Sequence, residues 1–296
     1  MFMPRQFLLL CACCALLAFA PAADRPAYRL FTATGKPADY DKMLAELAQA
    51  DVVFFGEQHN DALGHWLELQ VLKDLAKLKK PGQLVLGLEM FERDVQPLVA
   101  QYAAGILPDT SFERQTRPWP NYTIDYKPLL QFAREQHISI VGTNAPRPYA
   151  RQVARGSLAV LEQLPAAEKA LLAPLPLQVD TGWPGYKKMA AMFGADASAH
   201  GGGAQPIIQA QALKDATMAH FIRNNVAPGQ TLLHVNGSYH SDNHDGIVGY
   251  LRQTAPALRV RTLSVVSQGS LKQLAKDNQN LADFVVVIPE DMAKTY

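Results

Sequence analysis

VVFFGEQH, residues 52–59, and LLHVNGSYH, residues 232–240, are two apolar runs that end in the same pattern, G-x-x-H. Short runs of this kind are typical of strands buried within a parallel sheet. In open α/β sheets, ligands bind at the edge where such strands end, and His59 and His240 would both emerge there. The repeated pattern predicts one polar site built from two segments that lie far apart in the chain.

Similar apolar runs alternate with amphipathic segments along most of the chain. A leucine-rich stripe predicts a long helix after His59 that begins at Asn60, and further strands are expected at residues 84–88, 139–142, 260–266 and 284–288. Strands that alternate with helices require right-handed crossovers. We therefore predict an α/β fold with a mainly parallel sheet flanked by helices.

The middle of the chain departs from this alternation. Residues 107–128 are rich in proline and aromatic residues, which predicts an irregular excursion over the sheet. Residues 146–204 contain helical fragments broken by prolines, and they predict a small inserted helical subdomain that ends in a glycine-rich loop with His200. The α/β domain is then expected to comprise residues 23–145 and 205–296.

The first 22 residues have the features of an export signal. Arg5 precedes an apolar stretch at residues 7–19, and Ala20-Pro21-Ala22 offers small side chains for cleavage. All three cysteines lie in this segment, so the mature chain would contain neither a disulfide nor a thiolate ligand. Because residues 10–13 only faintly resemble a lipoprotein processing site, we expect a periplasmic or envelope-associated protein without a lipid anchor.

The charges of the mature chain are balanced. Of the 28 Lys and Arg residues one is Arg5, so 27 basic residues remain against 27 Asp and Glu. A chain with balanced charge lacks the excess of positive charge that is typical of nucleic-acid-binding proteins. After the signal, no segment has the roughly 20 continuous apolar residues of a membrane helix. We expect neither a nucleic-acid partner nor a membrane span.

Polar side chains are expected where several strands end, and they are Glu57, His59, Glu89, Asn144 and His240. Carboxylates and imidazoles at one rim can bind a divalent metal, perform acid–base chemistry or orient a ligand. A metal would be held by His59, Glu89 and His240, whereas a hydrolase would use these three with Glu57.

Two further histidines have different surroundings. His65 follows Asp61 by one helical turn, which leaves a structural and a functional role equally open. His234 lies within an apolar strand and is expected to be a hydrogen-bonded core residue.

Several distinctive segments occur in one order between residues 51 and 266. They are GEQHND at 56–61 with His65 a turn later, LEMFERDVQ at 88–96, Trp119, YKP at 126–128, NAPR at 144–147, QAQ at 209–211, DATMA at 215–219 and GSYH at 237–240 with Gly246. Together they resemble the ChaN family of haem-binding proteins. This family belongs to a wider group that includes the Tiki and TraB proteins and is similar to erythromycin esterases in its G-x-x-H motifs.

This resemblance implies an α/β domain with a small helical domain and a role in haem or iron uptake or trafficking. It also implies haem held between two protomers of a homodimer, with a tyrosine as iron ligand and a histidine nearby. The candidate residues here are Tyr239, His200, Tyr186 and His240, with Arg147 for the propionates.

Haem would be bound noncovalently, because the chain has no C-x-x-C-H motif. We expect a haem-binding protein rather than an enzyme, with a metal-dependent or acid–base hydrolase as the alternative.

Overall fold

The computed structural model describes residues 26–194 and 203–295. The expected export signal and His200 lie outside the described residues. Within the described part, no helix is both long enough and apolar enough to cross a bilayer.

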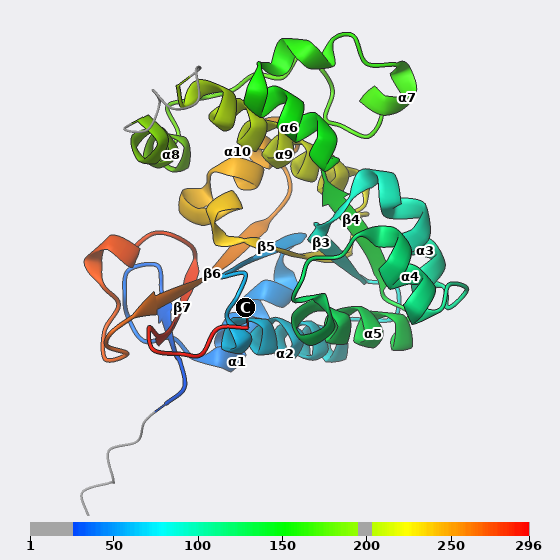
Figure 1. Cartoon of the computed structure of the whole chain (residues 1–296). Helices are drawn as coiled ribbons and strands as arrows, with labels where there is room; N and C mark the ends of the chain where they lie inside the picture. Colours follow the sequence, from blue (N-terminus) through cyan, green and yellow to red (C-terminus); the bar gives the residue numbers. More distant parts are fainter. Residues whose placement is uncertain (1–25, 195–202, 296) are drawn as a thin grey trace, which may run out of the picture.

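A seven-stranded sheet forms the centre of the molecule (Figure 1). Its order is β1-β7-β6-β2-β5-β3-β4, and only β1 runs antiparallel to its neighbour, β7. The strands are β1 (Arg29–Thr32), β2 (Val52–Glu57), β3 (Leu84–Glu92), β4 (Ser139–Asn144), β5 (Thr231–Gly237), β6 (Val260–Gln268) and β7 (Phe284–Pro289). The two strands that carry the G-x-x-H turns, β2 and β5, are direct neighbours at the centre of the sheet.

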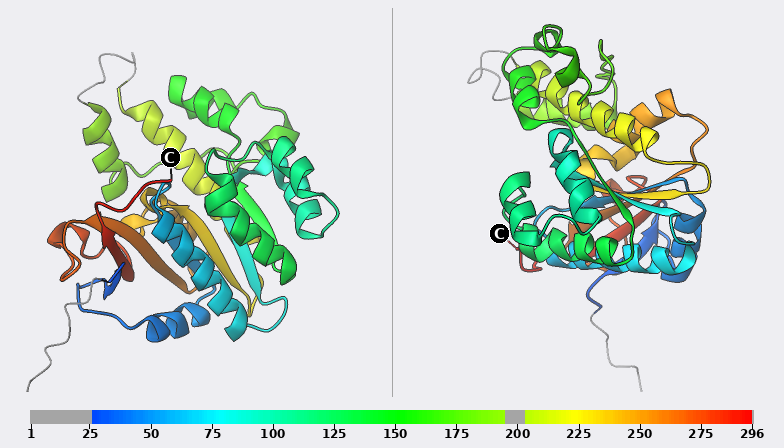
Figure 2. Two further views of the ribbon diagram at one scale, coloured as in Figure 1. Left: turned by 60° about the horizontal axis from the view of Figure 1, so that its bottom comes forward. Right: turned by 90° about the vertical axis from the view of Figure 1, so that its right-hand side faces the viewer.

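Helices cover both faces of the sheet (Figures 1 and 2). The helices are α1 (Tyr40–Gln49), α2 (Ala62–Leu78), α3 (Gln96–Ala103), α4 (Asp109–Thr116), α5 (Lys127–Glu135), α6 (Arg147–Arg155), α7 (Ala166–Lys169), α8 (Pro184–Gly194), α9 (Gln205–Asn224) and α10 (Gly246–Thr254). Shorter helical turns are η1 (Arg93–Val95), η2 (Tyr122–Tyr126), η3 (Leu158–Leu161), η4 (Ser238–His240), η5 (Asp242–His244) and η6 (Lys276–Asn278).

Strand β2 shows why the sheet needs helices on both sides. Val53 and Phe55 pack into the cluster formed with α1 to α5, whereas Val52 and Phe54 pack into the cluster formed with α8, α9 and α10. Successive side chains of a strand point to opposite faces. A run in which every residue is apolar is therefore stable only between two layers of helices.

The α/β architecture with its mainly parallel sheet is confirmed, and the differences from the sequence prediction are local. The strand that contains Glu89 does not end there, because β3 continues to Glu92 after a register shift that begins at Leu88. The long helix begins one residue later than expected, since Asp61 is its N-cap and accepts a hydrogen bond from the Gly64 amide at 2.8 Å. The short edge strand β1 was not anticipated.

The segment at 107–128 contains no strand, as expected, but it is more regular than an irregular excursion. Pro108 precedes α4 as its N-cap residue, and Pro128 occupies the first turn of α5. Proline is tolerated at these positions because the first turn of a helix leaves its amides unpaired. The prolines therefore mark helix starts here.

Helices α6 to α8 lie between β4 and β5 in the chain, where the inserted helical subdomain was expected. They are not separate from the helix that follows. Val153 of α6 and Leu161 share a buried cluster with Ala210 and Leu213 of α9. Helix α9 thus packs against both the inserted helices and the sheet.

Candidate functional site

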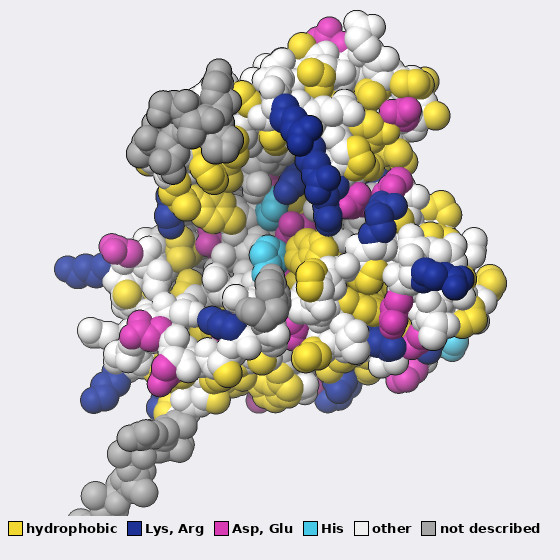
Figure 3. Space-filling view, in the orientation of Figure 1, with side chains coloured by type: hydrophobic (Ala, Val, Ile, Leu, Met, Phe, Trp, Pro, Cys, Tyr) yellow, Lys and Arg dark blue, Asp and Glu magenta, His cyan; other side chains and the backbone are white. Residues whose placement is uncertain are grey.

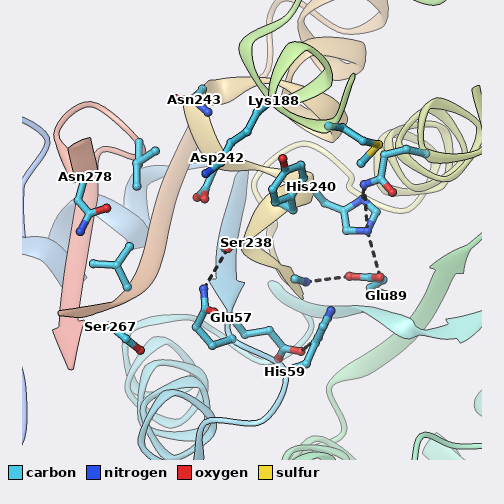
Figure 4. A pocket seen from close by; sticks show the side chains of 18 of the residues that line it. Glu57, His59, Glu89, Lys188, Ser238, His240, Asp242, Asn243, Ser267 and Asn278 are labelled. Carbon is cyan, nitrogen blue, oxygen red and sulfur yellow. Dashed lines mark hydrogen bonds and ion pairs between the residues drawn. The ribbon is translucent and has the colours of Figure 1, made fainter. Parts of the chain in front are cut away.

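A cleft of about 760 Å³ opens where the central strands end (Figure 4). The four residues that the sequence places at strand ends, Glu57, His59, Glu89 and His240, all line it. The prediction that they converge on one cleft is confirmed. In the space-filling view, histidine side chains are visible in a hollow of this face, with hydrophobic side chains gathered beside it (Figure 3).

The glycines of the two G-x-x-H turns each make room for the opposite turn. A Cβ atom on Gly237 would lie 2.6 Å from His59 Nε2, and one on Gly56 would lie 3.0 Å from Ser238 Cα. Glu57 and Gly237 are also register partners across β2 and β5. The repeated motif therefore reflects close packing of two turns that belong to one site.

His240 lies between two buried carboxylates. Its Nε2 is 3.1 Å from Glu89 Oε1, and its Nδ1 donates to Asp215 Oδ1. Burial lowers the pKa of His240, but the charges of Glu89 and Asp215 outweigh it and raise this pKa to about 10. Both ring nitrogens therefore carry protons at neutral pH, and His240 acts as a buried cation.

Glu89 is the anion that complements this cation. Its Oε2 accepts a hydrogen bond from the Gly237 amide at 2.8 Å. Burial raises the pKa of Glu89, but the positive charge and hydrogen bond of His240 outweigh it and hold this pKa far below the usual range. A charged glutamate is thus held within β3, fully paired.

His59 is oriented by Glu57 and remains open to the cleft. The His59 Nδ1 atom is 2.7 Å from Glu57 Oε1, and the hydroxyl of Tyr126 donates to the same oxygen. The ring packs edge-on against Trp119 at 4.8 Å, and 41% of the His59 side chain is exposed. Burial lowers the pKa of His59, but the hydrogen bond to Glu57 and the charge of Glu89 give a net increase. His59 can therefore exchange protons with a ligand in the cleft.

The two candidate tyrosines differ in accessibility. Tyr186 is buried, and its hydroxyl donates to Asp215 at 2.7 Å. Tyr239 lines the cleft, and among the described residues the hydrogen-bond partner of its hydroxyl is the Met192 sulfur, at 3.8 Å. Tyr239 can therefore reach a ligand without breaking a buried hydrogen bond.

The cations of the cleft are not those that the sequence suggested. Arg147 is held by Glu92, which is 3.4 Å from its Nε and also accepts from its backbone amide at 3.0 Å. The cleft is lined instead by Lys188 and Lys214, of α8 and α9. Lys188 Nζ lies 5.8 Å from the centre of the Tyr239 ring.

Asp215 lies in one of the segments that resemble the ChaN family, but the sequence analysis assigned it no role in the site. It is fully buried on α9, one turn after Gln211, which also lines the cleft beside His240. Gln211 and Asp215 lie at positions i and i+4 of an otherwise apolar helix face, and this spacing could have indicated that both side chains point to one polar site.

Two groups of side chains are relevant to metal binding. The predicted set of His59, Glu89 and His240 lines one wall of the cleft, but both nitrogens of His240 are engaged by carboxylates. Within the described part of the chain, donor atoms that all lie within 4.8 Å of one another belong instead to Glu57, His65 and Glu68.

The fold and the cleft together define an α/β protein with a polar ligand site built on two G-x-x-H turns at the end of a parallel sheet. The family model described as haem-binding uptake, Tiki superfamily, ChaN matches residues 43–251. The chain belongs to this family, as its motifs suggested.

A solved structure of a ChaN protein shows the same architecture. A structure described as cofacial haem binding to ChaN of Campylobacter jejuni is similar with a TM-score of 0.63 at 16% identity, over 88% of this chain and 96% of that chain. A mutant of the erythromycin esterase EreC in its open conformation is similar with a TM-score of 0.46 at 12% identity, over 89% and 83% of the two chains. No curated protein matches the sequence.

Proposed function

We propose that this protein is an exported haem-binding protein that serves haem or iron uptake or trafficking. In this proposal haem is held noncovalently in the cleft, with Tyr239 as iron ligand and a second protomer covering its outer face. The observation that carries the proposal is the position of Tyr239, which lines the cleft and whose hydroxyl lies next to the exposed Met192 of α8.

The residues at the cleft fit the chemical demands of haem. The phenol of Tyr239 would supply an oxygen donor for the iron. Met192, whose sulfur lies 3.8 Å from that hydroxyl, and Phe193 would supply apolar surface beside the cleft, since they are 59% and 40% exposed. Lys188 and Lys214 supply cations for the propionates. The volume of about 760 Å³ lies within the range of cofactor sites, which is roughly 300–1,000 Å³.

In this proposal, a second protomer packs against the same two side chains of α8. Burying exposed apolar side chains beside a ligand site would be favourable. The solved ChaN structure from Campylobacter jejuni is described as binding haem cofacially, which supports a face-to-face arrangement.

Bound haem would supply the iron centre, and the chain would supply ligand, orientation and charge. Tyr239 would act as a hard anionic donor that favours ferric iron. His59, held by Glu57, would exchange protons near the ligand. His240 would contribute a fixed positive charge to the wall of the cleft.

Hemin titration of the mature protein tests this proposal through the Soret band. We expect saturable binding by the wild type and a large loss of affinity in Tyr239→Phe. Tyr186→Phe is the matched control, because its hydroxyl is buried against Asp215, and it should bind hemin as the wild type does. Light scattering with and without hemin should report a dimer that hemin stabilises.

The outcomes separate the steps of the proposal. A wild type without a saturable Soret change would rule out haem binding. Unchanged binding by Tyr239→Phe would rule out this ligand and direct attention to His200 and His240.

One observation favours an acid–base hydrolase as a second candidate. His59 is oriented by a carboxylate at 2.7 Å and partly exposed to the cleft, which is the arrangement of a general base. An ester and peptide panel with His59→Gln as the control tests this function. No turnover by the wild type, or equal turnover by His59→Gln, would exclude a hydrolase that uses His59 as its base.

Export is proposed from the sequence of the first 22 residues, with cleavage after Ala22. The intact mass of protein recovered from the periplasm of an expressing cell should correspond to a chain that starts at Ala23 and does not change with reductant. A retained signal, or a diacylated Cys13, would contradict this.

A further inference from the structure

Beneath the cleft, a second cluster of ionisable side chains is buried between β2, α2 and η2. Glu57, His65, Glu68 and Asp125 are all at most 4% exposed. His65 and Glu68 lie one turn apart on α2, Glu57 ends β2, and Asp125 belongs to η2. The cluster therefore brings three carboxylates and one imidazole together from three elements.

The hydrogen bonds within this cluster leave acceptors without donors. Glu57 Oε2 and Glu68 Oε1 are buried, and neither has a hydrogen-bond partner among the described residues. An unpaired carboxylate oxygen in the interior is costly. Two such oxygens beside one histidine can be satisfied either by a proton or by a bound cation.

The orientation of His65 indicates which species fits. Its Nε2 lies 3.1 Å from the backbone carbonyl oxygen of His59, an acceptor, so Nε2 carries the proton. Its Nδ1 then presents a lone pair toward Glu68 Oε2 at 3.1 Å and Glu57 Oε2 at 3.5 Å. A metal-bound histidine characteristically donates its other ring nitrogen to a carbonyl or carboxylate in this way.

The spacing of the donor atoms suits a small cation. Donor atoms bound at about 2.0 to 2.1 Å to one ion lie about 3.0 to 3.4 Å apart. The distances from His65 Nδ1 to the two glutamates are close to this range, and one donor atom from each of the three residues lies within 4.8 Å of the other two. One imidazole and two carboxylates form a donor set that favours Mn²⁺, Fe²⁺ or Zn²⁺.

We propose that Glu57, His65 and Glu68 bind one divalent transition-metal ion in the interior, directly beneath the ligand cleft. The ion neutralises carboxylates that are otherwise unpaired. It also connects to the cleft, because Glu57 would meet the ion through Oε2 while its Oε1 accepts from His59 and Tyr126. The metal would thereby hold the carboxylate that orients His59.

Metal binding by the mature protein, stripped with chelator, tests this site. Titration with Mn²⁺ alone, followed by electron paramagnetic resonance, should show one tight equivalent. Glu68→Gln keeps the shape of the side chain and removes one ligand, so affinity should fall at least about 100-fold. His65→Gln should show the same loss, and circular dichroism reports whether each variant is folded.

Two controls determine where the ion binds. Glu46→Gln alters an exposed glutamate of α1 and should leave Mn²⁺ affinity unchanged. Glu89→Gln alters the cleft and should also bind Mn²⁺ as the wild type does. Mn²⁺ should raise the melting temperature of the wild type but not that of Glu68→Gln.

Three results would overturn the proposal. The first is that the wild type binds no saturable equivalent of Mn²⁺. The second is that Glu68→Gln and His65→Gln bind Mn²⁺ as tightly as the wild type does. The third is that only Glu89→Gln loses Mn²⁺ affinity. The last result would assign the ion to the cleft. Because the readouts are metal content and melting temperature, they do not depend on whether the protein binds haem.

Discussion

Replacing His240 with glutamine removes the buried cation between Glu89 and Asp215. In the wild type, these carboxylates outweigh the effect of burial and raise the pKa of His240 from 6.5 to about 10. Because the pKa is higher in the folded state, the stabilisation is complete below about pH 6.5 and is lost as the pH rises through 10.

The size of the effect follows from this difference in pKa. A group with pKa values of 6.5 unfolded and about 10 folded contributes roughly 4 kcal/mol to the free energy of unfolding at pH 7 and less than about 1 kcal/mol at pH 10. His240 is only 6% exposed, so solvent screening reduces this little. The wild type should therefore exceed His240→Gln in stability by several kcal/mol at pH 7.

Urea unfolding of both proteins at pH 7 and pH 10 measures this difference. Burial raises the pKa of Glu57 and Glu68 to about 8, so their titration also changes stability with pH. Both proteins share that contribution, and it cancels in the comparison. In the variant, the pKa of Glu89 rises because His240 no longer holds it down, and this partly offsets the change. The stability gap should therefore shrink by at most about 3 kcal/mol between pH 7 and pH 10. A gap of equal size at both pH values would refute a charged His240.

Two substitutions test packing and hydrogen bonding near the site. Gly237→Ala places a Cβ 2.6 Å from His59 Nε2, so it should lower the free energy of unfolding by about 1–3 kcal/mol and shift the His59 signals in NMR spectra. Gly64→Ala is the control, because the nearest atom to its Cβ is 3.6 Å away, and it should cause neither change. Unshifted His59 signals in Gly237→Ala would contradict the packing argument. Thr143→Val removes the hydroxyl 2.7 Å from His234 Nε2 and should cost about 1–3 kcal/mol in urea unfolding, and a neutral result would show that this nitrogen has another partner.

His234 also shows what a single strand reveals in advance. Its place in an apolar run predicted a satisfied core histidine, and it is fully buried between Thr143 and Asn236. Burial lowers the pKa of His234 to about 4 despite the hydrogen bond to Asn236, so it is neutral. The apolar strand was sufficient to predict a neutral His234, because burial is the largest influence on the pKa of this residue.

His65 shows where that kind of reasoning ends. The sequence left its role open, since a helix position does not reveal which loop covers it. In the structure, η2 places Asp125 Oδ2 3.6 Å from its Nε2, and Tyr126 packs against its ring at 4.9 Å. These neighbours are about 60 residues away in the chain.

The layers of this protein, and the edge of the sheet at which its site lies, can be read from the amino-acid sequence alone. Wholly apolar strands require helices on both faces, and polar residues at strand ends meet at one edge because parallel strands end together. The charge and the accessibility of each group depend on tertiary contacts. Glu89 and Asp215 together raise the pKa of His240, and Asp215 also accepts from the hydroxyl of Tyr186, while Tyr239 stays accessible. Such pairings depend on distances of a few ångströms between segments that lie far apart in the chain, and no local sequence pattern determines these distances.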